Sequence, residues 1–235
     1  MSFPSSTNVG NRLLSRLPSK ARTAILANAK VVPLESGELL CEANGLLKQV
    51  YFPLSGYISQ VISIGDHPPL QIGLIGAEGM LGATLALDID AAPMSALVQG
   101  PGSALRVGAT AFRTLLRVHP MLARTVKRYL YTEMEQLSQT TACTRFHQVN
   151  ERLARWLLMT HDRAVGDYFH LTHQSLADLL GVRRSGVTIA AGLLQGQHLI
   201  DYTRGEIHIL NRRGLESMSC DCYRAIIDDY ERWFA

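Results

Sequence analysis

Residues 172–195 read T-H-Q-S-L-A-D-L-L-G-V-R-R-S-G-V-T-I-A-A-G-L-L-Q, and two groups of apolar residues recur within them at helical spacing. This pattern predicts one helix over about residues 173–180 and a second over about residues 184–194. Gly181 lies between the two groups, where the end of a helix favours a residue that tolerates positive φ. The stretch is therefore expected to form two short helices around a tight turn.

Ala177, Gly181 and Val187 have the spacing of a helix-turn-helix, in which small residues let the two helices cross closely. Arg183 and Arg184 stand at the start of the second helix, the end that enters the DNA major groove in this motif. The sequence thus predicts a DNA-reading element. Many all-helical domains also contain two helices joined by a glycine, so the flanking sequence has to decide between the two interpretations.

Residues 199–210, L-I-D-Y-T-R-G-E-I-H-I-L, follow the second helix. Their near-alternating apolar residues around Thr203, Arg204 and Gly205 predict a β-hairpin. A helix-turn-helix followed by a hairpin is a winged helix, and this favours the DNA-reading interpretation.

The totals fit an ordinary globular chain of 235 residues with 47% apolar residues. No apolar run approaches the roughly 18 residues of a membrane span, and no secretion signal is expected at the N-terminus. The cysteines lack a C-x-x-C pair, so reduced thiols and a cytoplasmic location are expected. The cysteines are Cys41, Cys143, Cys220 and Cys222.

The positive charge near the predicted DNA-reading element comes from arginine, although the net charge of the chain is only +3. Residues 144–213 hold nine basic side chains, all arginine, and six acidic ones. Arginine suits phosphate groups and guanine edges better than lysine does. Some of these arginines fit solvated helix faces instead and are not assigned to DNA: Arg145, Arg152, Arg155 and Arg163.

The N-terminal half has a different pattern of apolar residues, glycine and proline. Residues 11–29 predict one or two short helices broken near Pro18. Over residues 30–107, short apolar runs punctuated by glycine and proline predict a β-sandwich or barrel. The glycine-rich residues 76–83, G-A-E-G-M-L-G-A, form either an ordinary turn or one that offers backbone N–H groups to an anion.

Residues 121–143 predict a long helix with an apolar stripe at three- and four-residue steps. Packing against the chain's own β-domain would explain the stripe, and so would a two-fold partner helix. About 23 residues span roughly 35 Å, close to the spacing of DNA half-sites. Further helices are expected over about residues 145–162 and 220–233. The stripe consists of Leu122, Val126, Tyr129, Leu130, Met134 and Leu137.

This order of elements resembles the CRP/FNR family of bacterial transcription regulators along nearly the whole chain. The resemblance implies an α+β fold: an N-terminal β-roll sensor like a cyclic-nucleotide-binding domain, a long dimerisation helix and a C-terminal winged helix-turn-helix. It divides the chain into residues 1–29 (tail and short helices), 30–120 (sensor), 121–143 (dimerisation helix) and 144–235 (DNA-binding domain). It also implies a homodimer joined along the long helix.

The resemblance carries over to the second helix residue by residue. Arg184 matches the arginine that leads the family's recognition helix, Ser185 stands where glutamate is common, and Ile189 replaces a second base-reading arginine. We therefore expect DNA binding without the family's usual half-site. Bases would face Arg184, Ser185 and Thr188; phosphates would face Arg183, Thr172, His173 and Arg204.

The sensor departs further from the family pattern. Members that bind cyclic AMP carry a Gly-Glu motif; here Glu78 lies in the glycine-rich turn, but Met94, next to Ser95, replaces the arginine that pairs with the cyclic phosphate. Weak or absent cyclic AMP binding is expected in a pocket of Glu78, Gly79 and Ser95. No cofactor or metal is identified and the effector is unknown, since Cys41 alone lies among the sensor strands and Cys220 and Cys222 are expected to diverge on one helix.

The sequence thus predicts a homodimeric, sequence-specific transcription regulator that binds double-stranded DNA and RNA polymerase and no membrane. It is not expected to be an enzyme, because it shows no nucleophile–base spacing, paired carboxylates or P-loop. The alternative is a ligand- or redox-sensing module whose C-terminal head serves protein contacts. Salt-dependent affinity for duplex DNA separates the two.

Overall fold

The computed structural model describes residues 10–164 and 166–234. Its contacts divide the chain into two compact units, which are described separately. The first unit holds the described residues up to Ser59, residues 75–133 and Phe234. The second holds residues 60–74 and 134–233. Strands β3 and β4 and helices α4 and α9 each have residues in both units.

The first unit holds most of a sheet with the strand order β1-β5-β3-β4, in which β2 also pairs with β5. Of these strands, β4 belongs to the second unit except for Ile75. The β1–β5 register runs from Ala29 opposite Val107 to Leu34 opposite Gly102. The predicted β-rich segment and the break near Pro18 are confirmed. The elements are α1 (Arg12–Ser15), α2 (Ser19–Asn28), β1 (Ala29–Leu34), β2 (Leu39–Cys41), β3 (Gln49–Ile62), β4 (Leu70–Ile75), the 3₁₀ helix η1 (Ala83–Leu87), β5 (Ser95–Gly108) and α3 (Ala109–Val118).

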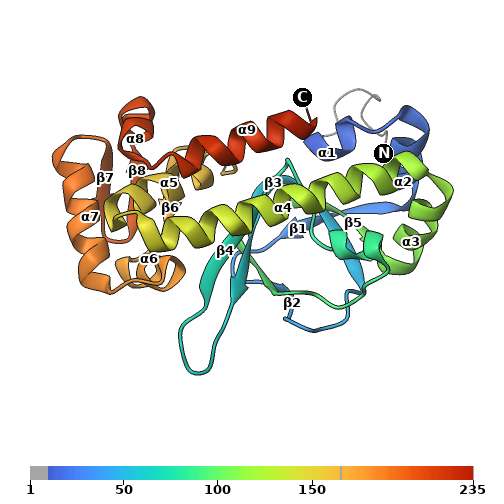
Figure 1. Cartoon of the computed structure of the whole chain (residues 1–235), viewed down its shortest axis with the longest axis horizontal. Coiled ribbons are helices and arrows are strands. Elements are labelled where there is room, and N and C mark those ends of the chain that lie inside the picture. The colour runs from blue at the N-terminus through green and yellow to red at the C-terminus, as the bar shows by residue number, and fades with distance from the viewer. Residues whose placement is uncertain (1–9, 165, 235) are drawn as a thin grey trace. The chain divides into compact units, whose positions relative to one another are not determined.

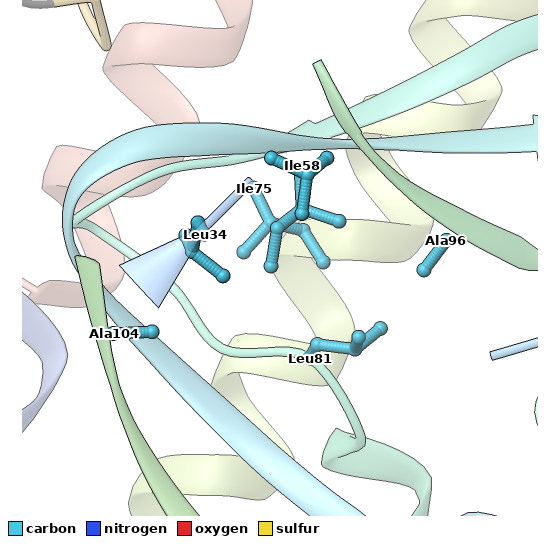
Figure 2. Close-up of a cluster of buried hydrophobic side chains, with 7 residues drawn as sticks. Leu34, Ile58, Ile75, Leu81, Ala96 and Ala104 are labelled. Atoms are coloured by element: carbon cyan, nitrogen blue, oxygen red, sulfur yellow. The ribbon is translucent and has the colours of Figure 1, made fainter. Parts of the chain in front are cut away.

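A cluster of fully enclosed aliphatic side chains fills this unit, and Figure 2 shows Ile58 and Ile75 at its centre. All members except Leu81 come from strands, several of them far apart in sequence, so their burial holds the sheet together. A second contact is aromatic: the rings of Phe52 and Phe112 meet edge to face with centroids 6.0 Å apart. The cluster consists of Leu34, Ile58, Ile75, Leu81, Ala96, Val98 and Ala104.

The long helix α4 (Pro120–Phe146) extends beyond the predicted residues 121–143 at both ends. Proline suits its first position because the first N–H groups of a helix have no partner within it. Three residues of the predicted apolar stripe are buried within the single chain: Leu122, Val126 and Tyr129. Contacts in the first unit therefore explain that half of the stripe.

The second unit contains a three-stranded antiparallel sheet, β6-β8-β7, and a group of helices. Strand β6 and helix α8 were not predicted, and the last helix begins at Cys222 rather than at Cys220. No helix among the described residues is long and apolar enough to cross a bilayer. The elements are α5 (Val149–His161), β6 (Tyr168–His170), α6 (His173–Leu180), α7 (Arg184–Gly196), β7 (Ile200–Thr203), β8 (Glu206–Ile209), α8 (Arg212–Met218) and α9 (Cys222–Phe234).

Candidate nucleic-acid interface

Helices α6 and α7 form the predicted helix-turn-helix (Figure 1). Gly181 ends α6 in the left-handed conformation with φ 62°, and the N–H of Val182 donates to the carbonyl of Ala177 at 2.9 Å. A side chain at position 181 would strain this backbone and would place its Cβ 2.8 Å from Leu70 Cδ1. The buried residues of the two helices are Leu176, Ala177, Leu180, Val187, Ala190, Ala191 and Leu194.

The opposite face of α7 is open to solvent. Arg184, Ser185 and Thr188 are exposed, as predicted for residues that face base edges. Ile189 is exposed as well, with 74% of its surface accessible. Arg183, immediately before the helix, is also exposed. Arg183 and the first two turns of α7 together present two guanidinium groups, two hydroxyls and one aliphatic side chain.

Thr172, a predicted phosphate contact, caps the N-terminus of α6. Its hydroxyl accepts a hydrogen bond from the N–H of Ser175 at 3.1 Å. Such a cap satisfies one of the N–H groups that the helix leaves without a partner. The hydroxyl of Thr172 is therefore already engaged within the domain.

His173, a predicted phosphate contact, makes several contacts within the domain. Its ring stacks on Tyr202 with centroids 4.3 Å apart, and its Nδ1 lies 3.0 Å from the hydroxyl oxygen of Thr188. Burial and the neighbouring Arg184 lower the pKa of His173, which keeps the ring uncharged at neutral pH. The half-buried histidine therefore joins α6, α7 and the wing, and it brings no charge to the surface at neutral pH.

The predicted hairpin is confirmed as the pair β7 and β8. Arg204 occupies its turn with φ 53° and is exposed, next to Gly205 with φ 89°. The hydroxyl of Tyr202 donates to the carbonyl of Leu171 at 3.0 Å and so fixes the wing to the start of α6. The wing therefore holds one exposed cation at its tip.

Two other arginines differ from the solvated residues that the sequence predicts. Arg152 and Arg155 are both buried in the second unit. Arg152 donates to the carbonyl of Leu180, and Arg155 donates to the hydroxyl of Thr140 at 2.9 Å. They support the inner side of α6 and the end of α4. Their charges are consequently not available at the surface of the second unit.

Arg212 also stabilises the fold, a role that was not predicted from the sequence. Its guanidinium donates to Asp162 Oδ1 at 2.6 Å, to Glu216 Oε1 at 3.1 Å and to the hydroxyl of Tyr223 at 2.6 Å. These bonds tie α8 to α5 and α9. The sequence offered one signal for them, the i,i+4 spacing of Arg212 and Glu216.

The predicted effector residues of the first unit make contacts with their own chain. Glu78 is buried, and its Oε1 accepts from the N–H of Gly76 at 3.1 Å. A side chain at Gly79 would collide with the ring of Tyr129. The hydroxyl of Ser95 accepts from the N–H of Ala43 at 3.0 Å. Met94, half-buried beside it, brings no charge to the site.

The prediction that the side chains of Cys220 and Cys222 diverge on one helix is wrong, because the two residues do not lie on the same helix. Because α9 begins at Cys222, Cys220 lies in the link after α8, and both thiols turn toward Cys143 and His147. Cys143 Sγ and Cys220 Sγ are 3.6 Å apart. Their hydrogen bond lowers the pKa of Cys143 to about 5 and raises that of Cys220.

The chain was compared with known families and structures. The family model of the Crp-like helix-turn-helix domain matches residues 151–218. No curated protein sequence matches the chain. Among solved structures, FixK2 from Bradyrhizobium japonicum is similar with a TM-score of 0.68 and 17% identity, covering 82% of this chain and 98% of that one.

Two further structures are similar over nearly their whole length. A transcriptional regulator of the crp/fnr family from Eubacterium rectale has a TM-score of 0.68 at 15% identity, covering 90% of this chain and 99% of that one. The c-di-GMP-responsive regulator CLP from Xanthomonas campestris has a TM-score of 0.66 at 16% identity, covering 82% and 99%. At these identities the likeness establishes the fold.

The geometry and the domain match define a DNA-binding protein of the winged helix-turn-helix class. Residues 151–218 match the Crp-like helix-turn-helix domain, and the chain, with its β-rich first unit and long helix α4, shares the fold of solved structures of CRP/FNR family regulators. The resemblance and the fold class predicted from the sequence are confirmed.

Proposed function

We propose that the chain is a sequence-specific regulator that reads DNA as a homodimer through the exposed face of α7. The observation that carries this proposal is the position of Arg184, exposed at the N-terminal end of a recognition helix whose other face is buried. An arginine there suits the O6 and N7 acceptors of guanine. Ser185 and Thr188 add hydroxyls to the same face, and the aliphatic Ile189 suits a thymine methyl group.

Arg183 and Arg204 are the proposed phosphate contacts. Both are exposed, and they lie on different elements, one before α7 and one at the wing tip. Each phosphate neutralised by a cation releases counterions, so affinity should fall steeply with salt. RNA polymerase is the proposed protein partner, and the cytoplasm is the proposed location.

The dimer seam that we propose runs along the outer face of α4. Since Leu122, Val126 and Tyr129 are buried within the chain, the seam cannot use the whole predicted stripe. Exposed positions continue at three- and four-residue steps on another face, with Leu130 and Leu137 half-buried beside them. These exposed positions are Tyr131, Met134, Ser138, Thr141 and Arg145.

Met134→Asp is expected to weaken dimerisation at least about tenfold, because it replaces the apolar contact of Met134 with two carboxylates that lose water when the seam forms. Met134 is 63% exposed in the single chain, so the substitution leaves each chain's own core intact. Sedimentation velocity over a concentration series measures the change. Met121→Asp, an exposed methionine on a different face of α4, is the matched control. A Met134→Asp protein that dimerises like the wild type would place the seam elsewhere.

The first unit is proposed to respond to something other than cyclic AMP. Met94 cannot neutralise a cyclic phosphate, and Glu78 is already engaged by the backbone of its own turn. Isothermal titration with cyclic AMP is expected to show no sub-millimolar affinity, with non-cyclic AMP as the control ligand. A sub-millimolar dissociation constant for cyclic AMP alone would contradict this proposal.

A second candidate function has one observation in its favour. Ile189 and Leu193 are exposed apolar residues on the face of α7 assigned to DNA, which a protein partner could also cover. In that case the winged helix-turn-helix would show no salt-dependent affinity for duplex DNA. Fluorescence anisotropy with random duplex DNA at several salt concentrations separates the two functions.

A further inference from the structure

Four side chains with metal-binding groups converge in the second unit. Cys143 lies in the last turn of α4 and His147 directly follows that helix, while Cys220 lies in the α8–α9 link and Cys222 begins α9. One ligand atom from each lies within 4.8 Å of every other. The two pairs come from segments more than 70 residues apart, so the fold brings them together.

The distances match those of a tetrahedral site. With Zn–S bonds of about 2.3 Å and Zn–N bonds of about 2.0–2.1 Å, tetrahedral geometry puts two sulfurs about 3.8 Å apart and a sulfur and a nitrogen about 3.6 Å apart. Cys143 Sγ lies 3.6 Å from Cys220 Sγ, and Cys222 Sγ lies 3.4 Å from His147 Nδ1. The four groups therefore need little movement to share one ion.

The surroundings suit a bound ion with thiolate ligands. All three cysteines are buried, and the side-chain amide of Gln139 donates to Cys222 Sγ at 3.0 Å. Three thiolates and a neutral imidazole around a divalent ion carry a net charge of −1. The buried cations Arg152 and Arg155 interact favourably with Cys143 and offset that charge. Arg155 Nε has no hydrogen-bond partner among the described residues.

We propose that Cys143, His147, Cys220 and Cys222 bind one structural zinc ion. A set of three thiolates and one imidazole selects zinc over magnesium and calcium, which prefer oxygen. Four protein ligands fill the tetrahedral shell and leave no open position for catalysis. The ion joins the end of α4 to the start of α9, so it fastens the C-terminal helix within the second unit.

Two other uses of these cysteines fit less well. A disulfide between Cys143 and Cys220 would leave Cys222 and His147 at 3.4 Å from each other without a shared function. An iron–sulfur cluster attaches its ligands to several iron atoms and spreads them further apart than one ion does. Ligand atoms that all lie within 4.8 Å of one another favour a single ion.

The test measures metal content in the full chain, purified under reducing conditions from zinc-supplemented cells. The wild type is expected to hold one zinc ion per chain, as measured by inductively coupled plasma mass spectrometry. Cys143→Ser and Cys220→Ser are expected to lose it, whereas Cys41→Ser, at a cysteine outside the cluster, should retain it. Cobalt titrated into the metal-free protein should give the visible bands of a tetrahedral thiolate complex in the wild type and in Cys41→Ser.

A milder variant covers the case in which the serine variants do not fold. Gln139→Ala removes the hydrogen bond to Cys222 and keeps every ligand, and it is expected to weaken zinc binding roughly 10- to 100-fold in chelator competition. Unchanged affinity in Gln139→Ala together with full metal content in Cys220→Ser would overturn the proposal. So would a reduced wild type that takes up neither zinc nor cobalt, a metal-free Cys143–Cys220 disulfide, or iron accompanied by acid-labile sulfide.

Discussion

Arg184→Ala is expected to weaken binding to the preferred DNA site by roughly 1–3 kcal/mol per half-site and to blur discrimination at one base pair. Arg184 is exposed at the first position of α7 and makes no ion pair that is seen among the described residues. Its removal therefore takes away a base contact and leaves the fold intact. Alanine also keeps the carbonyl that accepts from Thr188 at 3.1 Å.

The experiment begins with selection of bound fragments from genomic DNA, which supplies the site. Anisotropy titrations then compare the wild type and Arg184→Ala on that site and on single-base variants of it. Arg204→Ala is the control, since a phosphate contact should weaken all sequences alike and reduce the salt slope by roughly 1 for each half-site. An Arg184→Ala protein that binds its site like the wild type would remove the base-reading assignment.

Phe112→Ala is expected to lower the free energy of unfolding of the first unit by about 3–5 kcal/mol. Phe112 is fully buried in α3 and meets Phe52 edge to face, so its loss removes both apolar burial and an aromatic contact. Such a decrease is a large part of the 5–15 kcal/mol that a domain typically has. Urea unfolding followed by circular dichroism measures it.

Phe146→Ala is the matched control, because Phe146 is 77% exposed in the single chain. Its substitution should change the unfolding free energy by about 0.5 kcal/mol or less. Comparable losses in the two variants would show that the Phe52–Phe112 contact is not a main support of the first unit. A protein kept below its dimerisation concentration gives the cleanest comparison.

The helix-turn-helix and its wing could be predicted because their signals are local. Gly181 marks a backbone turn that few other residues tolerate, and the alternation around Arg204 marks a hairpin. The spacing of Ala177 and Val187 then fixes which faces meet. Short elements gave no such signal: β6 has three residues and α8 has seven, too few for a periodic pattern.

The cysteine cluster was missed because its geometry depends on a helix boundary. If α9 began at Cys220, the side chains of Cys220 and Cys222, with one residue between them, would point in different directions from the helix. Because α9 begins at Cys222, both thiols point toward Cys143 and His147. Helix ends are poorly fixed by sequence alone. The partners Cys143 and His147 lie far away in the chain, and the sequence predicted them on two different helices, over residues 121–143 and 145–162.

The internal contacts of His173 have a consequence for how this protein could acquire new DNA targets. The stack on Tyr202 and the contact with Thr188 hold α6, α7 and the wing together from beneath the exposed face of α7. Ser185 and Ile189 take no part in those contacts and project from the same face. Under the proposed base contacts, substitutions at these two positions are therefore expected to change the preferred sequence at little cost in stability, so that target choice and folding can evolve independently.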